Sequence, residues 1–316
     1  MNRRAFLSTS ALSALAFAVP AFAEWTPTRP IEAIVPYDAG GGTDTIARAL
    51  AGAMGDILGQ PVVVANKPGA SGIVGATAAA NSAPDGSTML ITSGGSFVLN
   101  SVMQALDIDP FEDFIAIAQI GDLTTSIMVP ANSPYQSLDD LIAAAKAAPG
   151  SLRWAHTGRG SFHNVAGQGF LNALGLSAVD IAFKGGSATR AAVIGSQVDF
   201  GMIGIQQLAG FETELRALAL VSDARDSYAP DVPTFAELGV QVPLITSPIV
   251  AYAPKGTPDD VVAGLRSAAA AAASSDGFKE LMANGKNSLA YLDGPETTAK
   301  MMQMRDDAKA IVSSMN

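Results

Sequence analysis

Two glycine-rich loops, each followed by a helical pattern, constrain the fold of this chain more than any other feature. The first loop, residues 39–44, follows the apolar run 31–36 and leads into a helical pattern over 44–58. The second loop, residues 157–161, leads in the same way into a helical pattern over 162–174. A helix that begins directly after such a turn leaves its first backbone N–H groups without intrahelical partners. Two turns of this kind that face each other would bind an anion.

Apolar runs typical of strands alternate with helical patterns along most of the chain. This alternation predicts an α/β fold with largely parallel sheets, each flanked by helices. The expected strands are 31–35, 62–65, 88–92, 127–130, 152–155, 180–183, 198–202, 217–221 and 249–253. The expected helices are 44–58, 72–82, 137–148, 162–174, 187–194 and 234–238, followed by a tail, 257–316, with helices and no obvious strand.

The length of 316 residues suits two domains of ordinary size. We expect the chain to leave the first domain near Met128 and to return near residue 249. Residues 24–128 and 249–316 would then form the first domain, and residues 129–248 the second. The two crossings between the domains would act as a hinge.

The N-terminus has the pattern of a secretory signal over residues 1–23. Arg3 and Arg4 precede an apolar stretch, and Ala21-Phe22-Ala23 supplies a cleavage site. The paired arginines are also compatible with export by the twin-arginine route. We therefore predict a periplasmic protein whose signal peptide is removed.

The charge balance and the lack of cysteine exclude several classes of partner. Removal of residues 1–23 takes away two arginines and no acidic residue, which leaves 17 basic and 29 acidic residues and a net charge of −12. Such a balance argues against nucleic acid or an anionic membrane as a partner. With no cysteine, the chain has no disulfide and no thiolate metal site.

Motifs for cofactors and catalysis are incomplete. Thr45 stands where a dinucleotide fingerprint requires its third glycine, and neither a P-loop nor a G-x-S-x-G elbow occurs. The only two histidines, His156 and His163, lack an accompanying acidic cluster, so we expect no metal and no cofactor. A secreted hydrolase would need His163 to activate Ser161. The alternative use of Ser161 is as the N-cap of the following helix.

Two further glycine turns follow predicted strands. They are Ser93-Gly94-Gly95-Ser96 and Lys184-Gly185-Gly186-Ser187. Because open parallel sheets bind ligands at the carboxyl ends of their strands, Ser93, Lys184 and Gly185 are expected to border the same cleft as the first two loops. A solvent-exposed lysine is the alternative for Lys184.

Motifs along nearly the whole chain after residue 23 resemble the Bug family, the periplasmic substrate-binding components of tripartite tricarboxylate transporters. The matching segments are 29–31, 35–37, 39–44, 47–48, 59–64, 66–70, 84–86, 158–161, 183–185, 216–219, 230–234 and 253–258.

The resemblance implies a two-domain Venus-flytrap fold that holds a ligand carboxylate between its domains, through backbone amides and hydroxyl groups. The contacts that it carries over are Tyr37, Ala39, Gly40, Gly41, Thr43, Asp44, Thr157, Gly158, Gly160 and Ser161. Two departures concern the expected cleft. Asn164 replaces the family's usual histidine three residues after Ser161, and residues 245–249 lack the usual tryptophan.

We interpret the chain as a solute-binding protein, not an enzyme, that captures a small organic carboxylate and delivers it to transporter membrane subunits. Arg159, between the two glycines of the second loop, could hold a second carboxylate and so favour a dicarboxylate. Its alternative is a guanidinium that points to solvent. A sensory receptor that presents a ligand would use the same fold, and a monomer is the default for such proteins.

Overall fold

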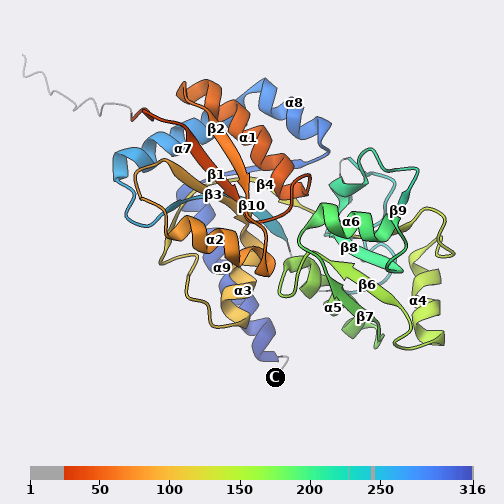
Figure 1. The fold of residues 1–316 in the computed structure, drawn as a ribbon. Coiled ribbons are helices and arrows are strands. Elements are labelled where there is room, and N and C mark those ends of the chain that lie inside the picture. The colour runs from red at the N-terminus through yellow and green to blue at the C-terminus, as the bar shows by residue number, and fades with distance from the viewer. Residues whose placement is uncertain (1–24, 227, 243–245, 315–316) are drawn as a thin grey trace, which may run out of the picture.

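Two β-sheets flanked by helices form two lobes in the computed structural model, which describes residues 25–226, 228–242 and 246–314 (Figure 1). The first sheet has the strand order β11-β4-β10-β3-β1-β2, and the second has the order β7-β6-β8-β5-β9. The first-lobe strands are β1 (Ile31–Val35), β2 (Val62–Asn66), β3 (Thr88–Ser93), β4 (Phe114–Leu123), β10 (Ser247–Pro254) and β11 (Ser288–Asp293). The second-lobe strands are β5 (Thr125–Pro130), β6 (Arg153–His156), β7 (Val179–Ala182), β8 (Phe200–Gly204) and β9 (Leu215–Val221).

Helices cover both faces of the first sheet because its central strands are apolar on both sides. In β1, Ala33 packs in a core with α1 (Gly42–Leu58), α7 (Asp259–Ser274) and α8 (Asp276–Asn284). The next residue, Ile34, packs on the opposite face with α2 (Ile73–Ala80), α3 (Gly94–Met103) and α9 (Gly294–Ser314). Successive strand residues point to opposite faces, so one strand contributes to both cores.

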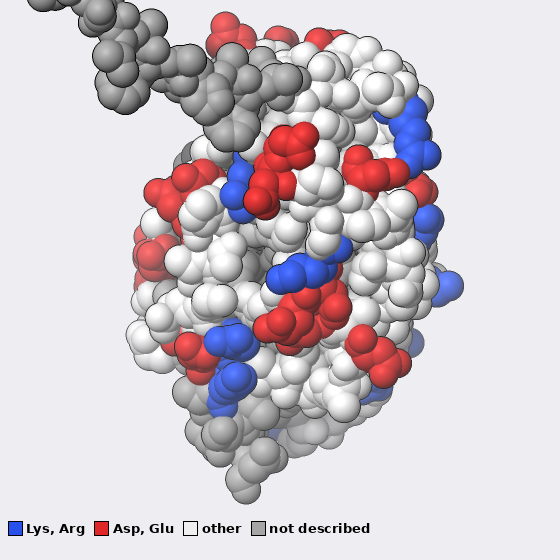
Figure 2. Space-filling model, turned by 90° about the vertical axis from the view of Figure 1, so that its left-hand side faces the viewer, with Lys and Arg blue, Asp and Glu red and all other residues white. Residues whose placement is uncertain are grey.

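The second sheet is covered in the same way. Trp154 of β6 packs with α4 (Leu138–Ala147) and α5 (Phe162–Ala173). Ala155 packs on the other face with α6 (Gly186–Ile194) and the short helix η2 (Ile205–Leu208). On the described surface shown in Figure 2, acidic and basic side chains are interspersed.

The two-domain α/β fold is confirmed, but both sheets are mixed rather than largely parallel. Strands β1, β2 and β3 pair in parallel, as do β6, β7 and β8. Strand β10 is antiparallel to β3 and β4, and β5 is antiparallel to β8 and β9. The reason is connectivity: β5 and β10 each enter their sheet from the other lobe, so they run against their neighbours.

The chain changes sheet first at Thr124, between β4 and β5, and again between β9 and β10. These crossings lie near the predicted domain limits at residues 128 and 249, which stay a prediction. Strand β5 already belongs to the second sheet.

Two sequence-based expectations for local structure were wrong. The C-terminal tail contains β11, a short edge strand whose partly buried side chains give no clear alternation. Residues 234–238 form a turn and not a helix, and Gly239 follows in the left-handed conformation. The glycine turn at 93–96 leads directly from β3 into α3, a helix that was not predicted. The predicted signal, residues 1–23, lies outside the described residues, and no helix in the described part of the chain is long and apolar enough to cross a membrane.

Candidate functional site

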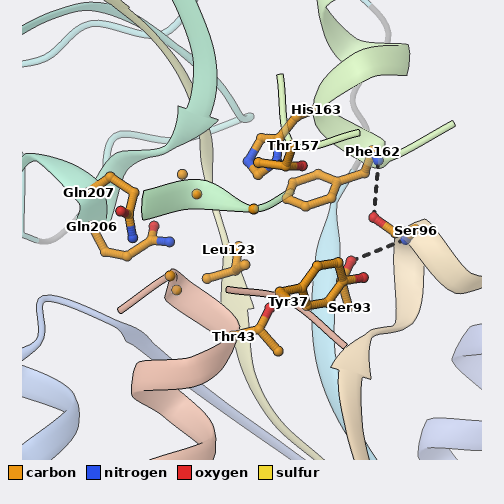
Figure 3. A pocket seen from close by; sticks show the side chains of 15 residues that line it. Tyr37, Thr43, Ser93, Ser96, Leu123, Thr157, Phe162, His163, Gln206 and Gln207 are labelled. Carbon is orange, nitrogen blue, oxygen red and sulfur yellow. Dashed lines mark hydrogen bonds between the residues drawn. The ribbon is translucent and has the colours of Figure 1, made fainter. Parts of the chain in front are cut away.

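A small cavity lies between the two lobes, where strands of both sheets end. It measures about 30 Å³, which is room for no more than a few water molecules. Its lining residues are Tyr37, Gly41, Gly42, Thr43, Ser93, Ser96, Leu123, Thr157, Phe162, His163, Gly185, Gly186, Gly204, Gln206 and Gln207 (Figure 3). None of these described residues carries a carboxylate, an ammonium or a guanidinium group. We call this space the interlobe cavity.

Four helix N-termini meet at the interlobe cavity. Helices α1 and α3 come from the first lobe, with N-caps Gly41 and Ser93. Helices α5 and α6 come from the second lobe, and their first turns contribute residues such as Phe162 and Gly186. A helix N-terminus carries a partial positive charge and N–H groups without intrahelical partners. The cavity therefore favours an anion although no charged side chain lines it.

In the first loop, Asp44 holds the backbone in place and is not itself a lining residue. Its buried carboxylate accepts hydrogen bonds from Gly40 N at 2.8 Å, Arg48 Nε at 2.9 Å and Asn66 Nδ2 at 2.8 Å. Among the described residues, no acceptor faces the N–H groups of Gly41, Gly42 and Thr43. The carboxylate thus fixes the turn from within and leaves these amides available at the cavity. Ala39 and Gly40 are exposed and lie outside the lining.

The second loop contains an internal hydrogen bond like that of the first loop, but it leaves fewer backbone amides free at the cavity. Gly160 N donates to Asn164 Oδ1 at 3.0 Å, which matches the bond from Gly40 to Asp44. Gly158 N donates to His156 Nδ1, and Ser161 N donates to the Gly158 carbonyl. Of residues 157–161, only Thr157 lines the cavity.

Both loops contribute to the interlobe cavity, but most of the second loop is seated on a different part of the first lobe. The second loop packs on the first lobe at Ser71 and Asn100, which are close enough that a Cβ at Gly158 or Gly160 would meet them. Gly158 and Gly160 have φ angles of 128° and 74°, a region that favours glycine.

The partner of the first loop is the glycine turn at the start of α6. Asp38 N donates to the Lys184 carbonyl at 3.4 Å, and Ser187 Oγ donates to the Ala39 carbonyl at 2.8 Å. At the other end of the cavity, Phe162 N donates to Ser96 Oγ at 3.2 Å. The lobes are therefore in contact in a closed arrangement, with each loop seated on a turn of the opposite lobe.

Ser161 and His163 do not form the nucleophile–base pair that a hydrolase would need, and Ser161 takes the alternative role of N-cap. Ser161 Oγ caps α5 by accepting from Asn164 N at 3.2 Å, and His163 Nδ1 is 2.9 Å from Thr157 Oγ1 instead. Burial, with a smaller contribution from His156 nearby, lowers the pKa of His163 to about 3. The imidazole of His163 is therefore neutral, and its ring lies beside Thr157 in the cavity (Figure 3).

The basic residues expected at the cleft do not reach the interlobe cavity. The Arg159 side chain is 73 % exposed and its Nη1 is 2.9 Å from Asp180 Oδ2. Lys184 is also exposed, and both residues border a separate surface hollow beside Ser71. Arg159 adopts the solvent-facing alternative because Asp180, in the neighbouring strand β7, supplies a counter-charge outside the cavity.

The comparisons agree with this geometry. The family model described as "Tripartite tricarboxylate transporter family receptor" matches residues 46–316. The chain belongs to this family. The receptor is 34 % identical to Protein BugT of Bordetella pertussis, over 81 % of this chain and 78 % of that protein. It superposes with a TM-score of 0.85 on periplasmic binding protein BugD, at 28 % identity over 91 % of this chain and 98 % of that one.

A further solved relative of the receptor is MatC from Rhodopseudomonas palustris, whose structure contains bound malate. It has a TM-score of 0.83 and 25 % identity, over 90 % of this chain and 99 % of MatC. The resemblance to the Bug family is thus confirmed, and the family is one of solute-binding receptors and not of enzymes.

Sequence reasoning missed two glutamines that line the cavity of the receptor. Gln206 and Gln207 lie in η2, directly after β8. Their position directly after β8, which ends at Gly204, is the sequence signal that could have identified them, because ligands of such sheets bind where strands end. The described residues contain no group of three or more His, Cys, Asp or Glu side chains that could hold a metal ion.

Proposed function

We propose that this receptor binds a small organic carboxylate in the interlobe cavity and delivers it to the membrane subunits of a tripartite tricarboxylate transporter. The observation that carries the proposal is the meeting of four helix N-termini at a cavity lined by uncharged residues. Each N-terminus favours an anion by roughly 0.3–1 kcal/mol, and backbone amides lose little conformational entropy when they bind. Residues 1–23 would direct the receptor to the periplasm, where a monomer would meet its ligand.

A dicarboxylate suits this site better than a monocarboxylate. Two of the helix N-termini belong to each lobe, so one carboxylate can face α1 and α3 while the other faces α5 and α6. MatC, which has the same fold, contains malate. The preference would not rest on Arg159, whose guanidinium is paired with Asp180.

The ligand would enter when the lobes separate about the crossings at Thr124 and between β9 and β10. In the closed arrangement the cavity has about 30 Å³, which is too little to admit a dicarboxylate beside the present side chains. Opening would break the interlobe hydrogen bonds of Ser187 and Phe162, and the lobes would then close on the ligand around a wider cavity.

A thermal-shift panel followed by calorimetry tests the proposal. The panel contains acetate, succinate, malate, citrate and benzoate, with sodium sulfate at equal ionic strength as the control for a general anion effect. A ligand that binds the native state raises the melting temperature by mass action. We expect succinate or malate to raise it most, with one molecule bound per chain. A shift equal to that with sulfate for every member would contradict the proposal.

A further inference from the structure

One residue that lines the interlobe cavity has a buried polar atom without a hydrogen-bond partner. Among the described residues, six buried side-chain polar atoms lack a hydrogen bond, and only His163 Nε2 belongs to a residue that lines this cavity. His163 is 4 % exposed. An unpaired buried polar group is unfavourable by about 1–3 kcal/mol, so a binding protein is expected to have such a group where its ligand supplies the missing bond.

The hydrogen on His163 can be placed from its other nitrogen. Nδ1 is 2.9 Å from Thr157 Oγ1, and among the described residues the buried Thr157 hydroxyl makes no other hydrogen bond. If the hydroxyl donates its hydrogen to Nδ1, that hydrogen is satisfied and the neutral ring must carry its own hydrogen on Nε2. In that arrangement Thr157 selects the tautomer whose hydrogen is on Nε2.

His163 supplies the second-lobe side of the cavity with a donor that the loop amides do not provide. The N–H groups of Gly158, Gly160, Ser161 and Phe162 already donate within the protein. Figure 3 shows His163 and Thr157 on the opposite side of the cavity from Tyr37 and Thr43. A ligand held by the α1 amides at one end would thus meet the imidazole at the other.

We propose that His163 Nε2–H donates to a ligand carboxylate oxygen on the second-lobe side, so that His163, oriented by Thr157, determines the preference for a second carboxylate. This inference rests on the proposed function. It adds that a neutral imidazole, and not Arg159, selects the second acidic group.

Two matched variants test the contact. His163→Phe keeps a ring and removes both nitrogens, whereas His163→Gln places an amide N–H near the position of Nε2. By calorimetry with succinate and malate, we expect His163→Phe to weaken binding roughly 10- to 100-fold, since a hydrogen bond to a charged group is lost. His163→Gln should stay within about tenfold of the wild type. Acetate should lose little affinity in either variant.

The tautomer is tested in the unliganded wild-type protein, with Thr157→Val as the comparison. Because the chain has two histidines, a long-range proton–nitrogen correlation spectrum shows two imidazoles. We expect His163 to be neutral and protonated on Nε2 at pH 7, and Thr157→Val to remove this preference. A hydrogen on Nδ1, or an imidazolium at pH 7, would overturn the inference.

The two proposals fail in different ways. If the wild type binds none of the carboxylates, the proposed function fails. If the wild type binds succinate or malate and His163→Phe binds it equally well, the role of His163 is refuted while the proposed function stands.

Discussion

Arg190 Nη1 donates to Gln207 Oε1 at 2.7 Å, and this bond fixes which end of the Gln207 amide faces the interlobe cavity. A guanidinium can only donate, so the amide oxygen must point to Arg190 and the amide N–H groups must point away. Arg190 is itself held over the Phe211 ring, with 4.1 Å between its Cζ and the ring centroid. The orientation of the Gln207 amide is therefore set by Arg190, a residue that does not line the cavity.

Replacement of Arg190 by methionine should therefore weaken carboxylate binding, although Arg190 does not line the cavity. The Gln207 amide would become able to turn its oxygen towards the cavity, and we expect a roughly tenfold loss of affinity by calorimetry, about 1.4 kcal/mol. Arg225→Met is the matched control, because it removes an exposed arginine that pairs with Glu237 in the same lobe. Equal affinities of the two variants would show that the hydrogen bond from Arg190 to Gln207 is not needed for binding.

Closure of the two lobes over the first loop should require that residue 42 has no side chain. A Cβ at this position would overlap Gln206 Nε2 and lie 3.0 Å from a methyl group of Leu123. Gly42→Ala should displace the Gln206 amide and lower ligand affinity by roughly tenfold, about 1.4 kcal/mol. Gly52→Ala in the same helix meets nothing within 4 Å. That control should bind normally and gain about 0.5–1 kcal/mol in the free energy of unfolding, measured by urea titration.

Asp44 should matter for stability as well as for binding. Asp44→Ala leaves the Gly40 amide without its acceptor, removes one of the two acceptors of Asn66 Nδ2, and leaves Arg48 without its ion-pair partner. We expect the free energy of unfolding to fall by about 3 kcal/mol in urea titration. Asp56→Ala, an exposed position on the same helix, should change it by less than about 0.5 kcal/mol. A small effect at Asp44 would mean that the turn holds its shape without the carboxylate.

Arg159→Ala should leave the choice of ligand nearly unchanged. The exposed guanidinium pairs with Asp180 outside the cavity, and exposed ion pairs contribute about 0–1 kcal/mol. Affinities for succinate and acetate, measured by calorimetry, should each stay within about threefold of the wild type. A selective loss of affinity for succinate would show that Arg159 contributes to ligand binding.

The neutral state of His163 should make the receptor less stable in mild acid. Burial lowers the pKa of this group from 6.5 to about 3, so the unfolded chain binds a proton below pH 6.5 that the native protein binds only near pH 3. The free energy of unfolding should therefore fall as the pH is lowered through this window, by about 2 kcal/mol between pH 7 and pH 5. His163→Gln should lose less stability over the same range in urea titrations. The pKa of His156 is also lowered by burial, so part of the acid dependence should persist in the variant.

Much of the local structure was predictable because it depends on short-range patterns. The capping box of Ser137 and Asp140 at the start of α4 and the N-cap role of Ser161 both follow from neighbouring residues, and the structure shows both. Strand β11 was not predictable, because an edge strand with partly buried residues shows little periodicity. Its place in the sheet is fixed by pairing with β4, which lies more than 160 residues earlier in the chain.

The sequence by itself determined that glycine turns lead from strands into helices, because glycine conformation and helix capping are local properties. It also determined the family, through motifs spread along the chain. Only the tertiary structure decided which turns meet, since packing between the lobes seats the first loop on the start of α6 and the second loop on Ser71 and Asn100. The same packing turned Arg159 outwards to Asp180 and brought His163, Gln206 and Gln207 to the cavity, because contacts between distant segments determine which side chains are buried.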